Sequence, residues 1–196
     1  MEDVEELKSV LERVEGKLIA SRKIYGALTF SAWLTAMMGY YVLSGLFGNG
    51  YVESLVYWAI GAVIVSYATK KVWDRYIAVL VSETGKESGI GLEILASWAI
   101  GSLIGWGIIP RLGLTTTPEE TVAVAILSFL GISLAGQALV TGDREEIPSF
   151  LAPLLGIPLV PVAGNQATLW AGFVAAFGFS LTIALYLLSA FKAIER

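Results

Sequence analysis

The sequence TVAVAILSFLGISLAGQALVT, residues 121–141, decides the fold class, because it carries no charged side chain over a length that can cross a membrane. A helix needs about 20 residues to span about 30 Å of hydrocarbon. Five other windows have a similar length and a mostly apolar composition: residues 24–47, 51–69, 90–109, 147–163 and 168–191. The sequence therefore predicts an all-α, polytopic integral membrane protein with six transmembrane helices.

The overall composition agrees with this prediction and excludes several kinds of chemistry. Hydrophobic residues make up 56% of the chain and charged residues only 15%, against about 25% charged in an average soluble domain. The chain has no Cys and no His, which excludes the usual zinc sites, haem ligation, thiol nucleophiles and Ser-His triads. We expect no metal site and no cofactor. The lack of Cys and the scarcity of Asn and Gln are also typical of heat-adapted proteins.

The distribution of Lys and Arg predicts the orientation. With the N-terminus inside, twelve of the thirteen basic residues lie on the cytoplasmic side and only Arg111 lies outside, as the positive-inside rule requires. The acidic opening does not resemble a signal peptide, so we expect both termini in the cytoplasm and a multi-pass protein of the plasma membrane. The expected organisation is a cytoplasmic amphipathic helix (1–23), a transmembrane domain (24–191) with a cytoplasmic helical extension (70–88), and a tail (192–196).

The N-terminal helix carries an apolar stripe at heptad spacing. Its members recur at steps of three and four residues, which places them on one face of a helix: Val4, Leu7, Leu11, Val14 and Leu18. The extension after the second span has a similar stripe, so the two helices are expected to cover each other or to lie on the lipid surface. The alternative is that the N-terminal stripe binds a partner subunit or a second copy of the chain.

Small residues predict where the transmembrane helices approach closely. Gly101 and Gly105 form a GxxxG step, and other small residues stand at similar spacings: Gly131, Gly172 and Ala176. We expect the third, fourth and sixth spans to form the tight core. The same residues also permit a homo-oligomer.

The fifth span, residues 147–163, contains four of the six prolines, at positions 148, 153, 158 and 161. Pro153 and Pro158 stand inside it, and each frees a backbone carbonyl that must find a partner in protein or in a cavity. A kinked helix, a helix beside a ligand cavity and a re-entrant half-span are all compatible with this pattern. The cavity alternative would bind a small neutral or apolar ligand, with these lining candidates: Gln137, Pro153, Gly156, Pro158, Asn165 and Gln166.

The acidic segments predict helix ends rather than phosphate chemistry. Thr117-Pro118-Glu119-Glu120 has a capping Thr, a Pro at the first helical position and acids in the first turn, so a helix should begin there. The chain has no Walker loop. Its net charge of −4 disfavours nucleic acid binding, and its basic residues are expected to face lipid head groups.

Two classes of function follow from these observations. No charged residue stands near the middle of a predicted span, which disfavours ion-coupled carriers and voltage sensors. The first class is therefore a non-enzymatic component of the lipid bilayer, either a small-molecule-binding or transport unit or an accessory subunit of a membrane complex. The alternative is an intramembrane aspartyl-type hydrolase that uses Asp74 and Asp143. Because Arg follows each Asp, solvated interfacial ion pairs explain both residues more simply.

Overall fold

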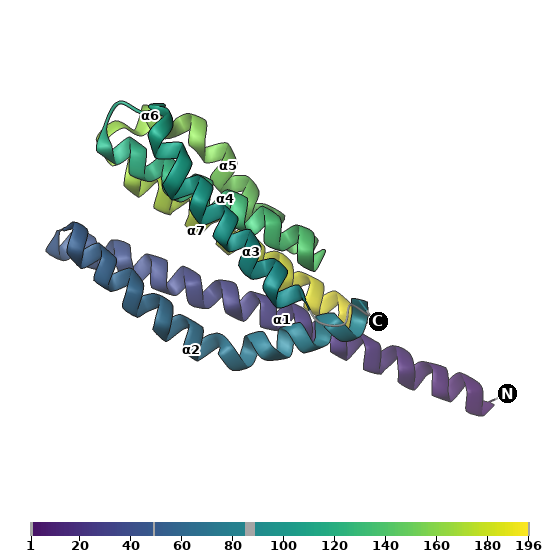
Figure 1. The fold of residues 1–196 in the computed structure, drawn as a ribbon. Helices are drawn as coiled ribbons and strands as arrows, with labels where there is room; N and C mark the ends of the chain where they lie inside the picture. The colour runs from purple at the N-terminus through teal and green to yellow at the C-terminus, as the bar shows by residue number, and fades with distance from the viewer. Residues whose placement is uncertain (1, 49, 85–88, 196) are drawn as a thin grey trace.

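The computed structural model describes residues 2–48, 50–84 and 89–195, with no side-chain description for residues 2–5, 9, 51, 83 and 84. Every regular element in these ranges is helical (Figure 1), so the all-α class is confirmed. The α-helices are α1 (Glu2–Phe47), α2 (Tyr51–Thr84), α3 (Ile90–Ser102), α4 (Pro118–Thr141), α5 (Ile147–Gly156), α6 (Val160–Ala163) and α7 (Ala167–Ile194). Single turns of other helix types link them: η1 (Leu103–Ile108), η2 (Ile109–Leu112), η3 (Arg144–Glu146), η4 (Ile157–Leu159) and η5 (Gly164–Gln166).

The six predicted windows fall within five segments that are long and apolar enough to cross a membrane. These segments are Glu6–Phe47, Val52–Ser82, Ile90–Leu112, Pro118–Thr141 and Arg144–Ile194. The last one is 51 residues long. It contains two antiparallel stretches, α5–α6 and α7, because η5 joins α6 to α7 and α7 packs back against α5.

The helices run up and down between two ends of a bundle. The end where α4 passes into η3 and where α7 ends is called here the C-terminal end, and the end where α1 passes into α2 and α6 into α7 the loop end (Figure 1). At a rise of about 1.5 Å per residue, the 46 residues of α1 extend over about 69 Å, more than twice the hydrocarbon thickness of a bilayer. The N-terminal part of α1 consequently projects past the C-terminal end of the bundle (Figure 1).

The two predicted extensions do not cover each other, so that expectation is wrong. The second half of α2 packs instead against the start of α3, where Tyr76, Leu80, Ile90 and Ile94 form a buried cluster. The stripe on the projecting part of α1 stays exposed at Leu7, Leu11, Val14 and Leu18. The side chain of Val4, residues 85–88 of the predicted extension and Arg196 of the predicted tail lie outside the described parts of the chain.

The core is centred on α4 and on the helices of the last segment, α5, α6 and α7. Half of the most apolar window of α4 is buried inside the protein, compared with 6% of the corresponding window of α2. The main buried cluster joins Leu127 of α4, Val160 of α6 and Val174 of α7. The packing order differs in part from the expected one: α7 contacts α1, α4 and α5, whereas α3 packs mainly on α4.

Glycine sets the distance between α3 and α4. A Cβ atom added to Gly105 would lie 2.6 Å from the backbone N and 2.7 Å from the Cα of Phe129 on α4, and one added to Gly101 would overlap Ser133. Gly131 and Gly172 are equally confined, by side-chain atoms of Leu154 and Tyr41. Ala176 lies half-buried on α7. These contacts show glycine used for packing within one chain.

The start of α4 confirms the predicted cap. Thr117 has an extended backbone and its hydroxyl accepts a hydrogen bond from the backbone N–H of Glu120, with Pro118 as the first helical residue. The Glu120 carboxylate accepts in return from the backbone N–H and the hydroxyl of Thr116. Reciprocal bonds of this kind satisfy amide groups that a helix start leaves without partners. The cap therefore fixes where the third connection ends and the central helix begins.

Replacing Gly105 with Ala should separate η1 from α4. The added methyl group would meet backbone atoms, which cannot rotate away, so we expect a loss of about 2 kcal/mol in the free energy of unfolding, typical of an overpacked interior. Gly91→Ala on α3, in the same apolar segment, is the matched control, because no atom lies within 4 Å of its added Cβ. Thermal unfolding in detergent measures both. Equal unfolding temperatures for the two variants would contradict the assigned contact.

Candidate functional site

Charged and hydroxyl side chains from five elements meet in the interior at the C-terminal end of the bundle. This group is called here the ionic cluster. Its members are Arg22 and Lys23 of α1, Tyr76 of α2, Gln137 of α4, Asp143 just before η3, Glu145 and Glu146 of η3, and Tyr186 of α7. Hydrogen bonds or ion pairs join all eight residues into one network. Because they come from parts of the chain far apart in sequence, the cluster fixes how the helices meet.

The end of α4 explains why three acidic residues face the interior. Gly142 follows α4 in the left-handed conformation, with φ of 70°, which a residue with a Cβ adopts only at a cost. Asp143 next adopts an extended backbone, and its N–H donates to the Thr141 hydroxyl at 3.3 Å. This sharp reversal of the chain places Asp143 and Glu146 in the interior at the C-terminal end of the bundle.

Asp143 is the centre of the network, with only 2% of its surface exposed. Its Oδ1 accepts from an Arg22 guanidinium nitrogen at 2.8 Å and from Lys23 Nζ at 2.7 Å. Its Oδ2 accepts from the hydroxyl groups of Tyr76 at 2.8 Å and Tyr186 at 2.9 Å. Four donors therefore surround one carboxylate, which compensates for its removal from water.

Lys23 connects Asp143 to a second carboxylate. Its ammonium group lies 2.8 Å from Glu145 Oε2, and only 9% of the Lys23 side chain is exposed. The same ammonium lies 5.6 Å from the centre of the Tyr186 ring, within the range of a cation–π contact. Lys23 thus binds η3 and α7 at the point where α1 leaves the bundle.

Glu146 forms the inner part of the cluster and is 1% exposed. Its Oε1 lies 2.9 Å from the Tyr186 hydroxyl oxygen, and the carboxyl group accepts from Gln137 Nε2 at 3.2 Å. The amide oxygen of Gln137 accepts in turn from the indole N–H of Trp98 on α3, at 2.9 Å. The network consequently reaches a sixth element, α3.

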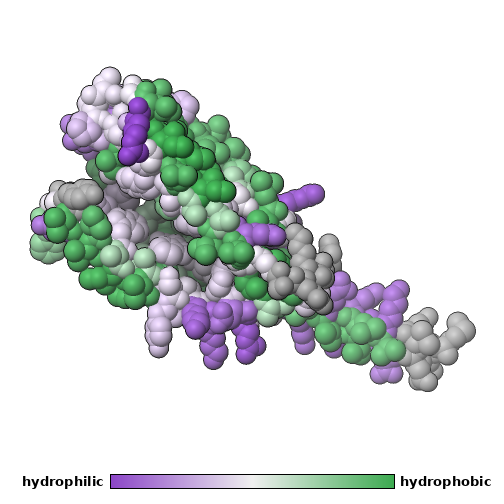
Figure 2. All heavy atoms as spheres, viewed as in Figure 1, coloured by the Kyte–Doolittle hydropathy of each residue, from purple (hydrophilic) through white to green (hydrophobic). Residues whose placement is uncertain are grey.

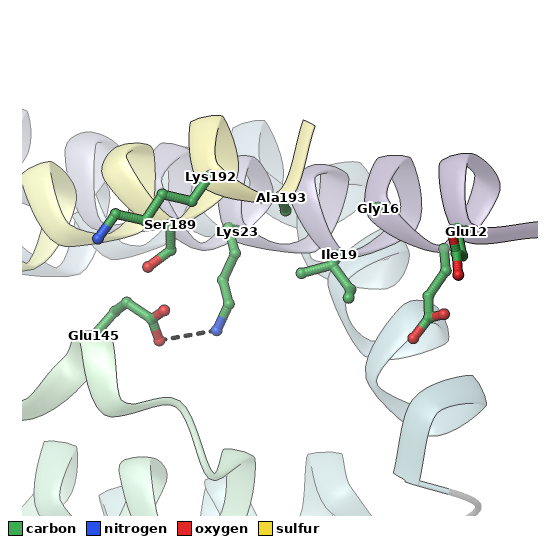
Figure 3. A pocket seen from close by; sticks show the side chains of 9 residues that line it. Glu12, Gly16, Ile19, Lys23, Glu145, Ser189, Lys192 and Ala193 are labelled. Carbon is green, nitrogen blue, oxygen red and sulfur yellow. Dashed lines mark hydrogen bonds and ion pairs between the residues drawn. The ribbon is translucent and has the colours of Figure 1, made fainter. Parts of the chain in front are cut away.

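A groove of about 420 Å³ opens beside the cluster, between α1, α7 and η3 (Figure 3). The Lys23–Glu145 pair borders it, and Ser189 and Lys192 contribute from α7. Its remaining lining residues are Glu12, Glu15, Gly16, Ile19 and Ala193. Acidic and basic groups both face this groove, so its chemistry suits a polar or zwitterionic group better than an apolar one.

The predicted ligand candidates lie in different places. Gln137 belongs to the ionic cluster, Pro153 and Gly156 are buried in the bundle, and Pro158, Asn165 and Gln166 are exposed. The α-helix does break after Gly156, where η4 begins. The Gly156 carbonyl accepts from the indole N–H of Trp170 at 3.0 Å, so a neighbouring helix supplies the polar partner at this break.

The two aspartates of the hydrolase alternative have different environments. Asp143 is buried and fully hydrogen-bonded, so the expectation that it is a solvated ion pair is wrong. Asp74 is exposed, although it stands only two residues before Tyr76 on α2. Helix geometry separates these positions by about 200°, which explains why Tyr76 faces Asp143 and Asp74 does not.

Sequence reasoning missed most of the cluster. In the sequence, Arg22 and Lys23 count only among the basic residues of the predicted cytoplasmic face, and Tyr76 and Tyr186 stand near span ends, where interfacial aromatic residues are common. The available signal was a pair of opposite charge runs, Arg22-Lys23 and Asp143–Glu146, at the same predicted membrane face. Such runs can form an ion-paired network as readily as two separate solvated surfaces.

Replacing Asp143 with Asn should destabilise the protein strongly. The variant keeps the shape of the side chain but removes the negative charge that pairs with the nearly buried Arg22 and Lys23, so we expect a loss of about 3 kcal/mol. Asp74→Asn removes the same charge at an exposed position and should change stability by less than about 0.5 kcal/mol. Thermal unfolding of both variants at neutral pH tests this difference. Similar losses would argue against the cluster as a stabilising centre.

Comparison with known proteins identifies no relative. The chain matches no protein-family model, no curated protein and no solved structure. What it does must consequently be inferred from its own geometry: the apolar helices, the ionic cluster, the groove beside it and the projecting part of α1.

Proposed function

We propose that this protein is a non-enzymatic, multi-pass component of the plasma membrane, and that it acts as an accessory subunit that assembles through the projecting part of α1. The observation that carries the proposal is the exposed apolar stripe on this helix. The proposed topology is six spans with both termini in the cytoplasm, which puts the C-terminal end of the bundle and its basic residues inside.

The outer surface of the bundle supports a location in lipid. Large apolar side chains are exposed on every long helix, among them Val42, Val63, Leu95, Leu139 and Phe173. Figure 2 shows hydrophobic residues over most of the visible bundle surface. A continuous apolar surface of this kind is rare on soluble monomers and is expected where a helix faces acyl chains.

The apolar stripe on α1 requires a different explanation, because it lies beyond the bundle. Leu7 and Leu11 are each 60% exposed and Val14 is 58% exposed. Figure 2 shows this hydrophobic patch flanked by hydrophilic residues. Since α1 is one continuous helix, its projecting part points away from the membrane when the bundle crosses the bilayer. Lipid therefore does not cover the stripe, and another protein helix is the fitting partner.

A second copy of the chain fits this surface best. Leu11 and Leu18 occupy heptad positions a, and Leu7 and Val14 occupy positions d, as in a parallel two-stranded coiled coil. Two copies inserted in the same orientation present these helices in parallel and in register. The register of the stripe therefore fits a parallel pair of identical helices.

Cysteine crosslinking tests this pairing directly, because the natural chain has no cysteine. Leu11→Cys at position a should form a disulfide-linked dimer in native membranes, since facing a positions bring their Cβ atoms close together. Arg13→Cys, at exposed position c, is the matched control and should remain monomeric. Non-reducing gel electrophoresis after mild oxidation measures both.

The other outcomes of this experiment are informative. A disulfide between Leu11→Cys and a different polypeptide would replace the second copy with another subunit and keep the accessory role. Absence of any crosslink at Leu7→Cys, Leu11→Cys and Val14→Cys would refute assembly through this helix.

Thiol labelling tests the proposed topology. Asn165→Cys at η5 should react with a membrane-impermeant maleimide on intact cells, whereas Glu195→Cys should react only after the membrane is opened, because the two residues lie at opposite ends of the bundle. The unsubstituted chain provides the background without a thiol. The reverse pattern, with Asn165→Cys protected and Glu195→Cys accessible on intact cells, would support a re-entrant fifth segment, and labelling of both positions from the same side would contradict the topology.

Ligand binding is the second candidate, and the groove beside the ionic cluster is the observation that favours it. The hydrolase alternative has less support. A catalytic carboxylate must exchange protons with water or substrate, but both oxygens of Asp143 already accept two hydrogen bonds each, and the exposed Asp74 makes no part of this network.

A further inference from the structure

The charges of the ionic cluster do not balance unless one carboxyl group is neutral. Arg22 and Lys23 contribute two positive charges, and within the described parts of the chain they form ion pairs with Asp143 and Glu145. Among the described residues, no Lys or Arg lies within salt-bridge distance of Glu146, which is nevertheless almost fully buried. A buried carboxylate without a cationic partner is strongly unfavourable, so the neutral form is the one that fits.

The hydrogen bonds lead to the same conclusion by a separate route. The Tyr186 oxygen lies 2.9 Å from Asp143 Oδ2 and 2.9 Å from Glu146 Oε1. A tyrosine hydroxyl has one proton and can donate to only one of these oxygens at a time. Both contacts are satisfied together when Tyr186 donates to Asp143 and a protonated Glu146 donates to the Tyr186 oxygen.

The groups packed around Glu146 decide which carboxyl group holds the proton. On the Asp143 side are Arg22 and Lys23 from α1 and the Tyr76 hydroxyl from α2, all of which favour an ionised Asp143. On the Glu146 side α4 contributes the neutral amide of Gln137, which α3 orients through Trp98, and α7 contributes Tyr186. Glu145 is already paired with Lys23. The asymmetry assigns the proton to Glu146.

Two further hydroxyl groups are buried one helical turn away from the cluster. Ser133 precedes Gln137 by one helical turn on α4, and Thr182 precedes Tyr186 by one turn on α7. Both side chains are 0% exposed, and neither hydroxyl oxygen has a hydrogen-bond partner among the described residues. A hydroxyl group can donate one hydrogen bond and accept others, so both retain this capacity.

We infer that Glu146 is a proton-binding site within the membrane protein, in which a neutral Glu146 donates to Tyr186 and Tyr186 donates to an ionised Asp143. Proton transfer along this chain moves the proton from Glu146 to the Tyr186 oxygen while the Tyr186 proton passes to Asp143, so no external reactant is required. If the proton left Glu146, Asp143 and Glu146 would both be carboxylates. Tyr186 could then donate a hydrogen bond to only one of them. This inference is independent of the pairing proposed for α1.

Infrared spectroscopy of the full-length chain reconstituted in lipid vesicles tests the site. At neutral pH the wild-type spectrum should contain the C=O stretching band of a protonated carboxyl group. Glu146→Gln should remove this band completely, because glutamine keeps the shape and the donor of the neutral acid without the carboxyl group. Glu145→Gln is the matched control one residue away, and it should remove an ionised carboxylate and leave the protonated band in place.

Each other result counts against the inference. A wild-type spectrum without the band, a band that survives in E146Q, or a band lost in E145Q would each overturn it. A Glu146→Gln chain that does not fold would also count against it, since glutamine closely reproduces a protonated glutamic acid. Tyr186→Phe provides a second readout: it removes the acceptor of the Glu146 proton and should shift the band in frequency, whereas an unshifted band would exclude the proposed bond.

Discussion

Compensation of buried charge is the constraint on which the rest of this structure depends. Asp143 can be buried only because two cations and two tyrosine hydroxyls point at it. These donors belong to α1, α2 and α7, while Asp143 itself follows α4. One carboxylate therefore fixes the relative positions of four long helices at the C-terminal end of the bundle. Apolar packing in a lipid environment is less selective, since it offers no comparable penalty for a helix that slides or rotates.

The loop end is held together differently. There Tyr40, Tyr57 and Trp58 pack ring against ring between α1 and α2, and Tyr57 donates to the Ala36 carbonyl at 2.7 Å. Such contacts bind α1 to α2, whereas α2 makes few contacts with α3. The α1–α2 hairpin is thus joined to the other helices mainly through α7 and the ionic cluster. For this reason we expect loss of the Asp143 charge at one end to weaken the whole arrangement.

The sequence predicts the fold class well because membrane helices must satisfy their backbone internally and must exceed a minimum length, and both requirements leave long apolar windows. Local signals also succeed: Thr117 and Pro118 mark the start of α4, and the prolines mark the break after Gly156. The ionic cluster is harder to predict. Arg22 and Asp143 are 121 residues apart, and only the packing of α1 beside the end of α4 makes them neighbours. Tyr76 and Tyr186 stand near the ends of predicted spans, where tyrosine commonly lies at the membrane interface.

The continuity of α1 connects the features of this molecule. A single helix carries the exposed stripe at Leu7–Leu18, the cluster residues Arg22 and Lys23, and the core residues Ala27 and Phe30. An α-helix is stiff over the length from the stripe to the core residues. A partner that binds the stripe therefore also determines the rotation of α1 about its axis. Rotation would move Arg22 and Lys23 relative to Asp143, and the cost of separating these charges opposes it. The ionic cluster thereby sets the direction in which the stripe faces, which is what the proposed pairing through α1 requires.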